Sequence, residues 1–321
     1  MKILIQHPAV LPVAKYGGTE RILFWHLCEL AGRGHEVTFI GPPGSDLARF
    51  KINYLPCQDA DWRSLIPPDI DLIHMFGPTH LHFDYPTLTT IHGNGKVGEQ
   101  FPLNTVFVSQ SHARTHGSTH FVYNGLDLRE YPVIKRAPMP WRDLMFLAKA
   151  SWSVKNLAQS ILACQKAKIN LHVAGGRRFY FSAGVFGHGK VDQQQKRAIA
   201  QRCQGLIFPV RWAEPFGIAI IEAMAYGLPV LGSNYGSLPE LIPENVGVCC
   251  QNFTELCAVL RERRHTFDAA EIRHYVEENF SIQKVTDNYL SYYQKVLNNE
   301  TLHISPPTRV SQSPPGKLLD F

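Results

Sequence analysis

Short apolar runs alternate with helical patterns along this chain of 321 residues, and this alternation constrains the fold more than any other feature. Unbroken apolar runs of this length are typical of strands that are buried on both faces. In the first half, a helical pattern covers 20–31 and the runs fall at 2–6, 36–40, 71–75, 88–91 and 105–108. The pattern predicts a parallel sheet with helices on both faces.

A second series of the same kind begins near Leu144. Strands are expected at 144–148, 171–174, 205–209 and 230–232, and helices at 153–167, 193–203 and 217–226. Two successive β/α series predict two doubly wound α/β domains. In such domains, ligands bind beyond the carboxyl ends of the strands.

Three prolines between Tyr131 and Trp141 mark the best linker. We therefore expect a first domain over 1–137 and a second over 138–280. Residues 281–298 read as a last amphipathic helix, because apolar and aromatic residues repeat there at helical spacing: Tyr289, Tyr292, Tyr293 and Val296. Residues 302–321 are rich in proline and serine and are expected to form a disordered tail.

Charge is distributed unevenly along the chain. Residues 1–137 carry 12 basic and 12 acidic side chains, whereas residues 142–211 carry 12 basic residues against Asp143 and Asp192 alone. This excess suits a diphosphate ligand, an anionic acceptor or peripheral contact with a membrane surface. A solvated basic face is the simpler explanation for most of these charges. No nucleic-acid-binding motif or long basic run occurs, so a nucleic-acid partner is not expected.

Other features of the composition favour a cytoplasmic protein. No run of 18 apolar residues exists, and the N-terminal apolar stretch is too short for a signal peptide. The seven cysteines are odd in number and contain no Cys-x-x-Cys pair, which indicates reduced thiols. The adjacent Cys249 and Cys250 read as strand residues rather than as a bridge.

The most specific motif is Glu-Pro-Phe-Gly-Ile-Ala-Ile-Ile-Glu at residues 214–222. The helix that follows ends at Gly227. Its N-terminal amides can hold an anion or a hydroxyl-rich ring, and they belong to Phe216, Gly217 and Ile218. Glu214 precedes the helix and Glu222 lies about two turns in, so the two acids can grip two parts of one ligand. The alternative is an amphipathic helix with an incidental buried glutamate.

Residues 211–230 as a whole resemble the signature of retaining GT-B glycosyltransferases of family 4, the glycosyl transferases group 1. The resemblance implies two Rossmann-like domains that face across a cleft, with a C-terminal helix that crosses back to the first domain. It also implies a catalytic role for Glu214 at the donor sugar and places Glu222 on the nucleotide ribose. The amides of Phe216, Gly217 and Ile218 would then contact donor hydroxyls.

Two further stretches of the first half match this family. Gly17 and Gly18 follow the first strand and open the first helix, where backbone can approach an anion closely. A plain β–α turn is the alternative, but the family's Gly-Gly loop reaches the donor diphosphate. His92 ends a strand and precedes a glycine, as does the family histidine that holds the donor sugar, which implies a catalytic role. A structural histidine is the alternative. His74 also matches a family position and is interpreted as packing.

Lys155, followed by Asn156, resembles the family lysine at the start of the second domain's first helix. The resemblance implies that Lys155 binds the diphosphate and stabilises the leaving nucleotide. Most relatives carry a Gly-Arg just upstream. Here Lys149 takes that place, one residue further from Lys155 than the pattern expects, and lysine carries the charge without the bidentate fork of arginine.

No metal site is expected. His112, His116 and His120 have helical spacing, but residues 117–119 break the helix and no carboxylate accompanies the set. Exposed histidines are the preferred interpretation. The absence of an Asp-x-Asp motif nearby also argues against the metal-dependent GT-A class.

The sequence thus predicts a cytoplasmic, metal-independent, retaining hexosyltransferase-type enzyme (EC 2.4) without a cofactor. Its donor would be a nucleotide diphospho-sugar, and its acceptor a glycan, a lipid-linked molecule or a small molecule. The donor base, the sugar, the acceptor and the oligomeric state carry no motif that identifies them. Two alternatives stay open: a GT-B nucleotide-sugar epimerase, and a non-catalytic nucleotide-sugar-binding module, which the altered Gly-Arg and the short length favour slightly.

Overall fold

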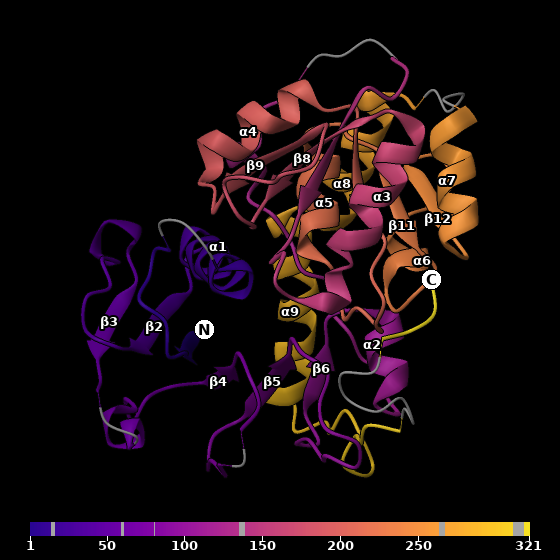
Figure 1. Ribbon diagram of the computed structural model, residues 1–321. Coiled ribbons are helices and arrows are strands. Elements are labelled where there is room, and N and C mark those ends of the chain that lie inside the picture. Colours follow the sequence, from indigo (N-terminus) through magenta and orange to yellow (C-terminus); the bar gives the residue numbers. More distant parts are fainter. Residues whose placement is uncertain (14–16, 59–60, 80, 135–138, 263–266, 311–317) are drawn as a thin grey trace. The chain divides into compact units, whose positions relative to one another are not determined.

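The computed structural model describes residues 1–13, 17–58, 61–79, 81–134, 139–262, 267–310 and 318–321 (Figure 1). The chain forms two compact units, which are described in turn. The first contains Met1–Leu126 and Ile282–Ser313, and the second contains Asp127–Ser281 and Pro314–Phe321. The chain passes to the second unit at Asp127, ahead of the expected boundary at 137. The reason is that Tyr131 is buried in the second unit, where its hydroxyl donates to Glu222.

The first unit is built on a parallel sheet of six strands in the order β3-β2-β1-β4-β5-β6. The strands are β1 (Lys2–Gln6), β2 (Glu36–Gly41), β3 (Asn53–Pro56), β4 (Leu72–Met75), β5 (Thr87–Ile91) and β6 (Thr105–Phe107). Its helices are α1 (Gly18–Gly32), α2 (Gln110–Thr115) and α9 (Ile282–Leu297), with short 3₁₀ turns η1 (Ala48–Phe50) and η2 (Trp62–Leu65). The sequence predicted every strand of this sheet except β3. That strand lies at the edge, where one side is open and little apolar pattern is needed.

The second unit repeats this architecture with the strand order β12-β11-β10-β7-β8-β9. The strands are β7 (Asp143–Leu147), β8 (Asn170–Ala174), β9 (Val185–Gly189), β10 (Gly205–Phe208), β11 (Val230–Ser233) and β12 (Gly247–Cys250). The α-helices are α3 (Leu157–Ala167), α4 (Gln193–Arg202), α5 (Ile218–Ala225), α6 (Leu238–Leu241), α7 (Phe253–Glu262) and α8 (Ala269–Phe280). Single 3₁₀ turns are η3 (Leu128–Glu130) and η4 (Ser153–Lys155). Of its strands, β9 was not predicted, and β12 was predicted only at Cys249 and Cys250; both are edges.

Both sheets have the same topology, in which the chain starts at a central strand, runs to one edge and then restarts on the other side. The predicted doubly wound α/β fold is therefore confirmed. The direction of winding changes between β1 and β4 in the first unit and between β7 and β10 in the second. Ligands of such sheets bind at this point, beyond the carboxyl ends of the strands.

The core of the second unit lies on both faces of its sheet. On one face α3 and α7 pack side by side (Figure 1), and they bury Cys164, Leu256 and Leu260 against β7, β8 and β10. Helices α5 and α8 pack together as a second pair. Cys249 and Cys250 are β12 residues with free thiols, as expected.

The helix predicted over 153–167 is interrupted. Ser153–Lys155 form the 3₁₀ turn η4, and α3 begins only at Leu157. Asn156 separates the two with a left-handed backbone (φ 59°), and its side-chain amide donates to the carbonyl of Pro209 at 2.9 Å. The turn sets the direction of Lys155 independently of α3.

Helix α9 returns to the first unit, as the sequence predicted. Its tyrosines Tyr289 and Tyr293 are buried, whereas Tyr292 is half-buried. The Tyr293 hydroxyl lies 2.9 Å from Nε2 of His26 on α1 and 2.7 Å from Nδ1 of His74 on β4. The other ring nitrogens bond to hydroxyls as well, His26 Nδ1 to Thr286 at 3.0 Å and His74 Nε2 to Thr90 at 2.8 Å. A fully satisfied polar network thus fixes α9 against α1 and the sheet, and His74 is structural.

Residues 302–310 differ from the disordered tail that the sequence predicted. They run along the first unit, where Thr308 forms an antiparallel bridge with Gln100 and its amide donates to the carbonyl of His116 at 3.0 Å. Arg309 is buried in this segment. The last four residues, 318–321, lie on the second unit, where Leu319 and Arg211 exchange hydrogen bonds. An extended segment that is held by backbone hydrogen bonds needs no apolar pattern. The composition therefore gave no sign that these residues are ordered. Residues 311–317 lie outside the described part of the chain.

In the part of the chain that the structure describes, no helix has both the length and the apolar character that a membrane crossing needs.

Removal of the Tyr293 hydroxyl should destabilise the first unit. Tyr293→Phe leaves one buried ring nitrogen of His26 and one of His74 without a partner, and each unpaired group costs about 1–3 kcal/mol. Tyr292→Phe is the matched control, because this half-buried hydroxyl can exchange its partner for water. Urea denaturation of both variants measures the difference. Equal loss in the two variants would show that the buried network does not hold α9.

Acid should weaken the same unit. Burial lowers the pKa of His26 from 6.5 to about 3 and that of His74 well below 6.5, so the folded state excludes protons that the unfolded chain accepts. The free energy of unfolding should therefore fall as the pH drops from 6.5 towards 3, by up to about 1.4 kcal/mol per pH unit for each histidine. His26→Gln, which cannot titrate, should reduce this slope. Urea midpoints that stay constant over this range would contradict the expectation.

Candidate active site

The carboxyl ends of β7 and β10 hold a buried ion pair between Lys155 and Glu214. Lys155 Nζ lies 2.5 Å from Glu214 Oε2, and the side chains are 12% and 7% exposed. The Lys155 ammonium also lies 5.1 Å from the ring centroids of Phe208 and Trp212. Trp212 Nε1 donates to the same carboxylate oxygen at 2.6 Å. The sequence nominated Lys155 and Glu214 separately, and the structure brings them together.

Glu214 is fixed through its backbone as well. Gly236 has a left-handed backbone (φ 62°), and a Cβ there would come within 2.3 Å of the Glu214 amide nitrogen. The next residue, Ser237, donates its amide to the Glu214 carbonyl at 3.0 Å and its hydroxyl to the Phe216 carbonyl at 2.8 Å. This close approach requires glycine at 236 and presses the Glu214 loop against the segment before α6.

The expected helix N-terminus is present. Gly217 is the N-cap of α5 with φ 83°, and α5 begins at Ile218, so the amides of 216–218 lie at the start of the helix. Phe216 is buried and packs edge-on against Phe280 at 6.0 Å. The phenylalanine of the motif therefore serves packing through its side chain, which leaves only its backbone for a ligand.

Glu222 lies in a second buried ion pair. Its Oε1 accepts from the Tyr131 hydroxyl at 2.6 Å and from the ammonium of Lys196 on α4. Glu222 and Lys196 are 8% and 6% exposed. Arg273 donates to the carbonyls of Tyr131 and Ala225 at 2.6 and 2.8 Å, which ties this group to α8. Glu222 thus has a fixed direction and an adjacent positive charge.

Sequence reasoning missed Lys196. A signal existed, because the helical pattern of α4 places Lys196 on one face with Ile199, Ala200 and Cys203, all buried. A lysine in the apolar stripe of a helix is almost never fully buried unless it is paired. The pattern therefore indicates a partner acid, although only the fold identifies Glu222 as that acid.

Lys149 lies apart from these pairs. It is exposed, and its ammonium stands 4.9 Å from the ring centroid of the exposed Trp152. Its carbonyl accepts from the Trp152 amide at 2.9 Å, in the turn that leads from β7 to Lys155. Lys149 lies just beyond the carboxyl end of β7, where the sequence placed it, and its ammonium faces solvent.

In the first unit, the carboxyl ends of β1 and β5 collect two histidines and the glycine loop. Gly17 is the N-cap of α1 with φ 143°, a backbone that favours glycine, and a Cβ there would lie 2.8 Å from a carboxylate oxygen of Glu20. His92 stacks on Phe76 at 5.1 Å. Its enclosed Nε2 has no hydrogen-bond partner among the described residues, nor has Nδ1 of His7, which directly follows β1.

These two imidazoles are neutral at physiological pH. Burial lowers the pKa of His92 to about 3, with a smaller contribution from His7. Burial also lowers the pKa of His7, and the nearby Glu20 partly opposes this. Neutral, unpartnered ring nitrogens at the carboxyl ends of strands suit hydrogen bonds with hydroxyls better than with phosphates. The sequence identified His92 and missed His7, which has no distinguishing pattern of its own.

The expectation of exposed histidines at 112, 116 and 120 was wrong. His112 and His116 are buried and His120 is half-buried, because the short α2 packs its histidine face against β6. His112 Nε2 bonds to the carbonyl of Gly93 at 3.1 Å, and His116 Nδ1 to the carbonyl of His112 at 2.8 Å. They therefore support the segment after His92. In the described parts of the chain, no group of histidine, cysteine and acidic residues is arranged as a metal site.

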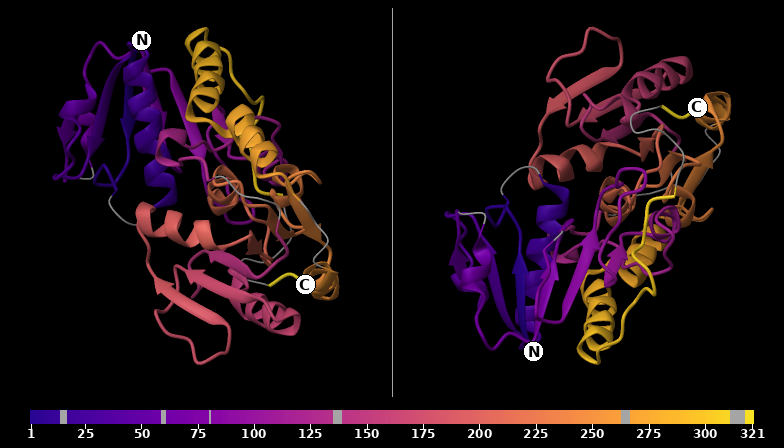
Figure 2. Two further views of the ribbon diagram at one scale, coloured as in Figure 1. Left: turned by 90° about the horizontal axis from the view of Figure 1, so that it is seen from above. Right: turned by 90° about the horizontal axis from the view of Figure 1, so that it is seen from below.

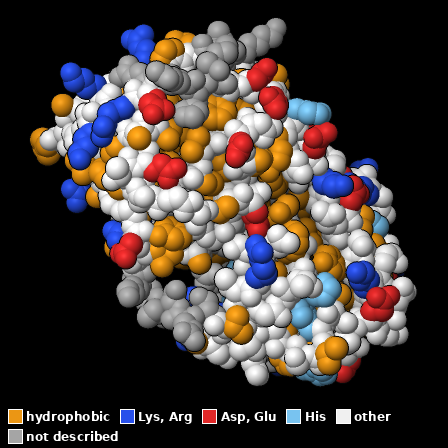
Figure 3. Space-filling model, turned by 90° about the vertical axis from the view of Figure 1, so that its right-hand side faces the viewer, with side chains coloured by type: hydrophobic (Ala, Val, Ile, Leu, Met, Phe, Trp, Pro, Cys, Tyr) orange, Lys and Arg blue, Asp and Glu red, His pale blue; other side chains and the backbone are white. Residues whose placement is uncertain are grey.

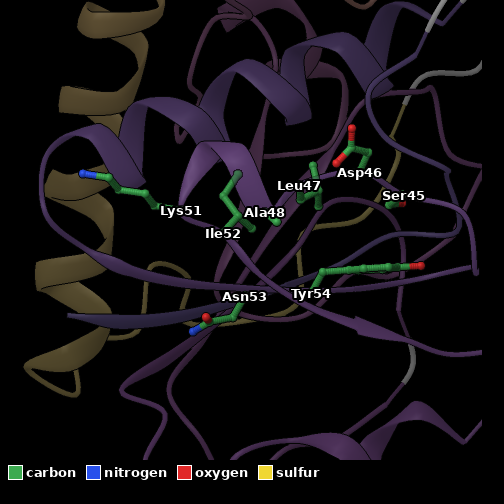
Figure 4. A pocket seen from close by; sticks show the side chains of 8 residues that line it. All are labelled: Ser45, Asp46, Leu47, Ala48, Lys51, Ile52, Asn53 and Tyr54. Carbon is green, nitrogen blue, oxygen red and sulfur yellow. The ribbon is translucent and has the colours of Figure 1, made fainter.

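A surface pocket also lies in the first unit between η1 and β3 (Figure 4). Its lining includes Asp46, Lys51 and Tyr54. Figure 4 shows the polar ends of these side chains pointing away from one another. They do not converge on one ligand position, so the strand ends remain the better candidate.

Comparison with solved structures identifies the class of fold. The chain superposes on a glycosyltransferase involved in avilamycin A biosynthesis with a TM-score of 0.77 at 18% identity, over 94% of this chain and 99% of that one. A structure of Anabaena HepE in complex with UDP and glucose gives 0.65 at 16% identity, over 92% and 100%. The fold is GT-B.

A comparison with family models gives a match within the second unit. Residues 142–259 match the model of the family Glycosyl transferases group 1. A phosphatidyl-myo-inositol mannosyltransferase of Propionibacterium freudenreichii subsp. shermanii is 26% identical over 140 residues, which are 40% of this chain and 36% of that protein. In the curated relatives, the matched stretches cover between 20% and 36% of the relatives' own lengths.

Loss of Lys196 should destabilise the second unit. Lys196→Ala leaves the buried Glu222 without its cation, and breaking a buried pair costs about 3–5 kcal/mol. The neighbouring exposed Arg197→Ala is the control and should change stability by less than about 0.5 kcal/mol. Lys196→Met combined with Glu222→Gln should recover most of the loss. Equal shifts of the melting temperature in Lys196→Ala and Arg197→Ala would contradict the pairing of Lys196 with Glu222.

Proposed function

We propose that this protein is a retaining glycosyltransferase that moves a sugar from a nucleotide diphospho-sugar to an acceptor, without a metal ion. The observation that carries the proposal is the pair of buried carboxylates, Glu214 and Glu222, each held by a lysine around the N-terminus of α5. The match of residues 142–259 to a glycosyltransferase family supports it, and a structural neighbour was solved with UDP and glucose.

In this proposal, the second unit binds the nucleotide. Glu222 receives the ribose hydroxyls in a direction set by Tyr131 and Lys196. The α5 amides at 216–218 contact donor hydroxyls. Lys155 has three N–H donors, one of which bonds to Glu214, so the ammonium can contact the diphosphate and the carboxylate together. The Gly17 and Gly18 amides and His92 of the first unit would act on the diphosphate and the sugar.

The reaction breaks the bond from the anomeric carbon to the β-phosphate oxygen and forms a bond from the same face to the acceptor oxygen. The acceptor proton passes to the leaving phosphate, which departs as the nucleoside diphosphate. Lys155 offsets the negative charge that grows on this leaving group. Glu214 holds the donor sugar while the bond breaks.

A binding module without catalysis is the second candidate, because Lys149, in place of the family arginine, lies on the solvent side. Donor hydrolysis separates the two. With UDP-, GDP- and ADP-sugars tested one by one, an enzyme releases free nucleotide and a binding module only shifts the melting temperature. Release should persist in EDTA. Activity that disappears in EDTA and returns with magnesium or manganese would overturn the metal-free mechanism.

Variants of the two pairs should affect different steps. Lys155→Ala and Glu214→Gln should lower turnover of the active donor by roughly ten- to a hundredfold, as expected for a lost charge-assisted hydrogen bond of about 1.5–3 kcal/mol. Glu222→Gln should mainly weaken nucleotide binding. The exposed Arg197→Gln is the control. If all of these variants kept the parent's turnover and binding, the two glutamates would be structural only.

A further inference from the structure

The crossover from β8 to β9 lacks a helix. The two strands are parallel, and parallel strands are usually joined by a helix. The connection over 175–184 contains ten residues, all described, and none of them is helical. Both views of Figure 2 show this connection at the periphery of the second unit.

The loop is held firmly against β9. A Cβ on Gly187 would lie 2.3 Å from the carbonyl oxygen of Arg177, so the loop backbone passes directly over this glycine. The Gly175 amide donates to the Gly189 carbonyl at 2.7 Å. Tyr180 packs against the core of the unit, and its hydroxyl accepts from the Arg177 amide at 3.1 Å. Tyr180 is thus the inward anchor of the loop.

The two neighbours of this anchor point outward. Phe179 is 81% exposed and Phe181 108% exposed. Single exposed apolar residues are common on protein surfaces, and Figure 3 shows many apolar side chains among charged ones on one face of this molecule. Two almost fully exposed phenylalanines on one firmly held loop are unusual. Both rings face water, so they add almost nothing to the packing of the protein.

Positive charge accompanies the two rings. Arg177 and Arg178 precede Phe179 and are exposed, and the loop contains no acidic residue. Over residues 142–211, Asp143 and Asp192 are the only acids. Two contributions hold a peripheral protein on a bilayer. Aromatic rings insert at the boundary of the acyl chains, and neighbouring cations bind the anionic headgroups. A protein partner would be expected to present a concave apolar pocket to each ring, whereas a bilayer accepts both at once.

We propose that the β8–β9 loop docks this protein on an anionic membrane surface, with Phe179 and Phe181 inserted and Arg177 and Arg178 on the headgroups. The site lies on the second unit, and the loop starts beside the turn after β7, where the Ala150 amide donates to the Gly175 carbonyl at 3.1 Å. It gives a location to the peripheral membrane contact that the charge distribution suggested.

Sedimentation with large unilamellar vesicles tests the proposal. The full chain should bind vesicles of mixed phosphatidylcholine and phosphatidylglycerol and bind pure phosphatidylcholine much less, and added salt should weaken binding. Phe179→Gln with Phe181→Gln should lower the partition constant at least about tenfold. Arg177→Gln with Arg178→Gln should lower it roughly 25-fold, about fivefold for each arginine.

Matched controls separate the loop from general surface character. Ile304→Gln with Val310→Gln removes two strongly exposed apolar side chains of the first unit. Arg114→Gln with Arg261→Gln removes the same charge from exposed sites on α2 and α7. Both controls should bind vesicles like the parent, and thermal melts should show all variants folded. Light scattering reports whether the parent is a dimer that the phenylalanine variant dissociates.

Four outcomes would overturn the proposal. One is that the parent does not bind anionic vesicles, and another is that the loop variants and the controls bind equally. The third is a dimer that is lost only in the phenylalanine variant, which would assign the rings to a second copy of this chain. Nucleotide binding that falls only in the loop variants, with vesicle binding intact, would assign the loop to the donor site instead.

Discussion

Two buried carboxylates constrain the second unit more than any other feature, because a buried charge must be paired where it lies. Glu214 and Glu222 flank the N-terminus of α5, and Lys155 and Lys196 reach them from two other elements, η4 and α4. Each pair therefore holds a helix or turn in position relative to α5. The same charges make the site chemically useful, since a ligand that enters meets oriented acids and cations without further reorganisation.

The winding of the sheets decides where such groups can gather. Lys155 follows β7 and Glu214 follows β10, and these strands are neighbours at the point where the direction of winding reverses. In doubly wound sheets, ligands bind at this point, beyond the carboxyl ends of the strands. In the first unit, His7 follows β1 at the corresponding reversal, whereas His92 follows β5, one strand beyond β4.

The first unit depends on polar contacts as well as on its apolar core. His26, His74 and Tyr293 are wholly buried, and every ring nitrogen of the two histidines has a hydroxyl partner. Such a network specifies one position for α9, because a shifted helix would leave several buried groups unpaired at once. The segment 302–310, which follows α9, continues along the same unit with backbone hydrogen bonds to residues near Phe101 and His116.

The sequence by itself predicted the two doubly wound sheets and nominated most residues of the candidate site, and its family resemblance implied the return of the last helix. Continuous apolar runs, helical periodicity and the motif around Glu214 are local signals, and local signals survive without knowledge of the fold. Only the tertiary structure paired Lys196 with Glu222, buried His112 and His116, and placed residues 302–310 on the first unit. These results depend on which distant residues meet. A charge, an imidazole or an extended backbone looks the same in the sequence whether water or a partner satisfies it.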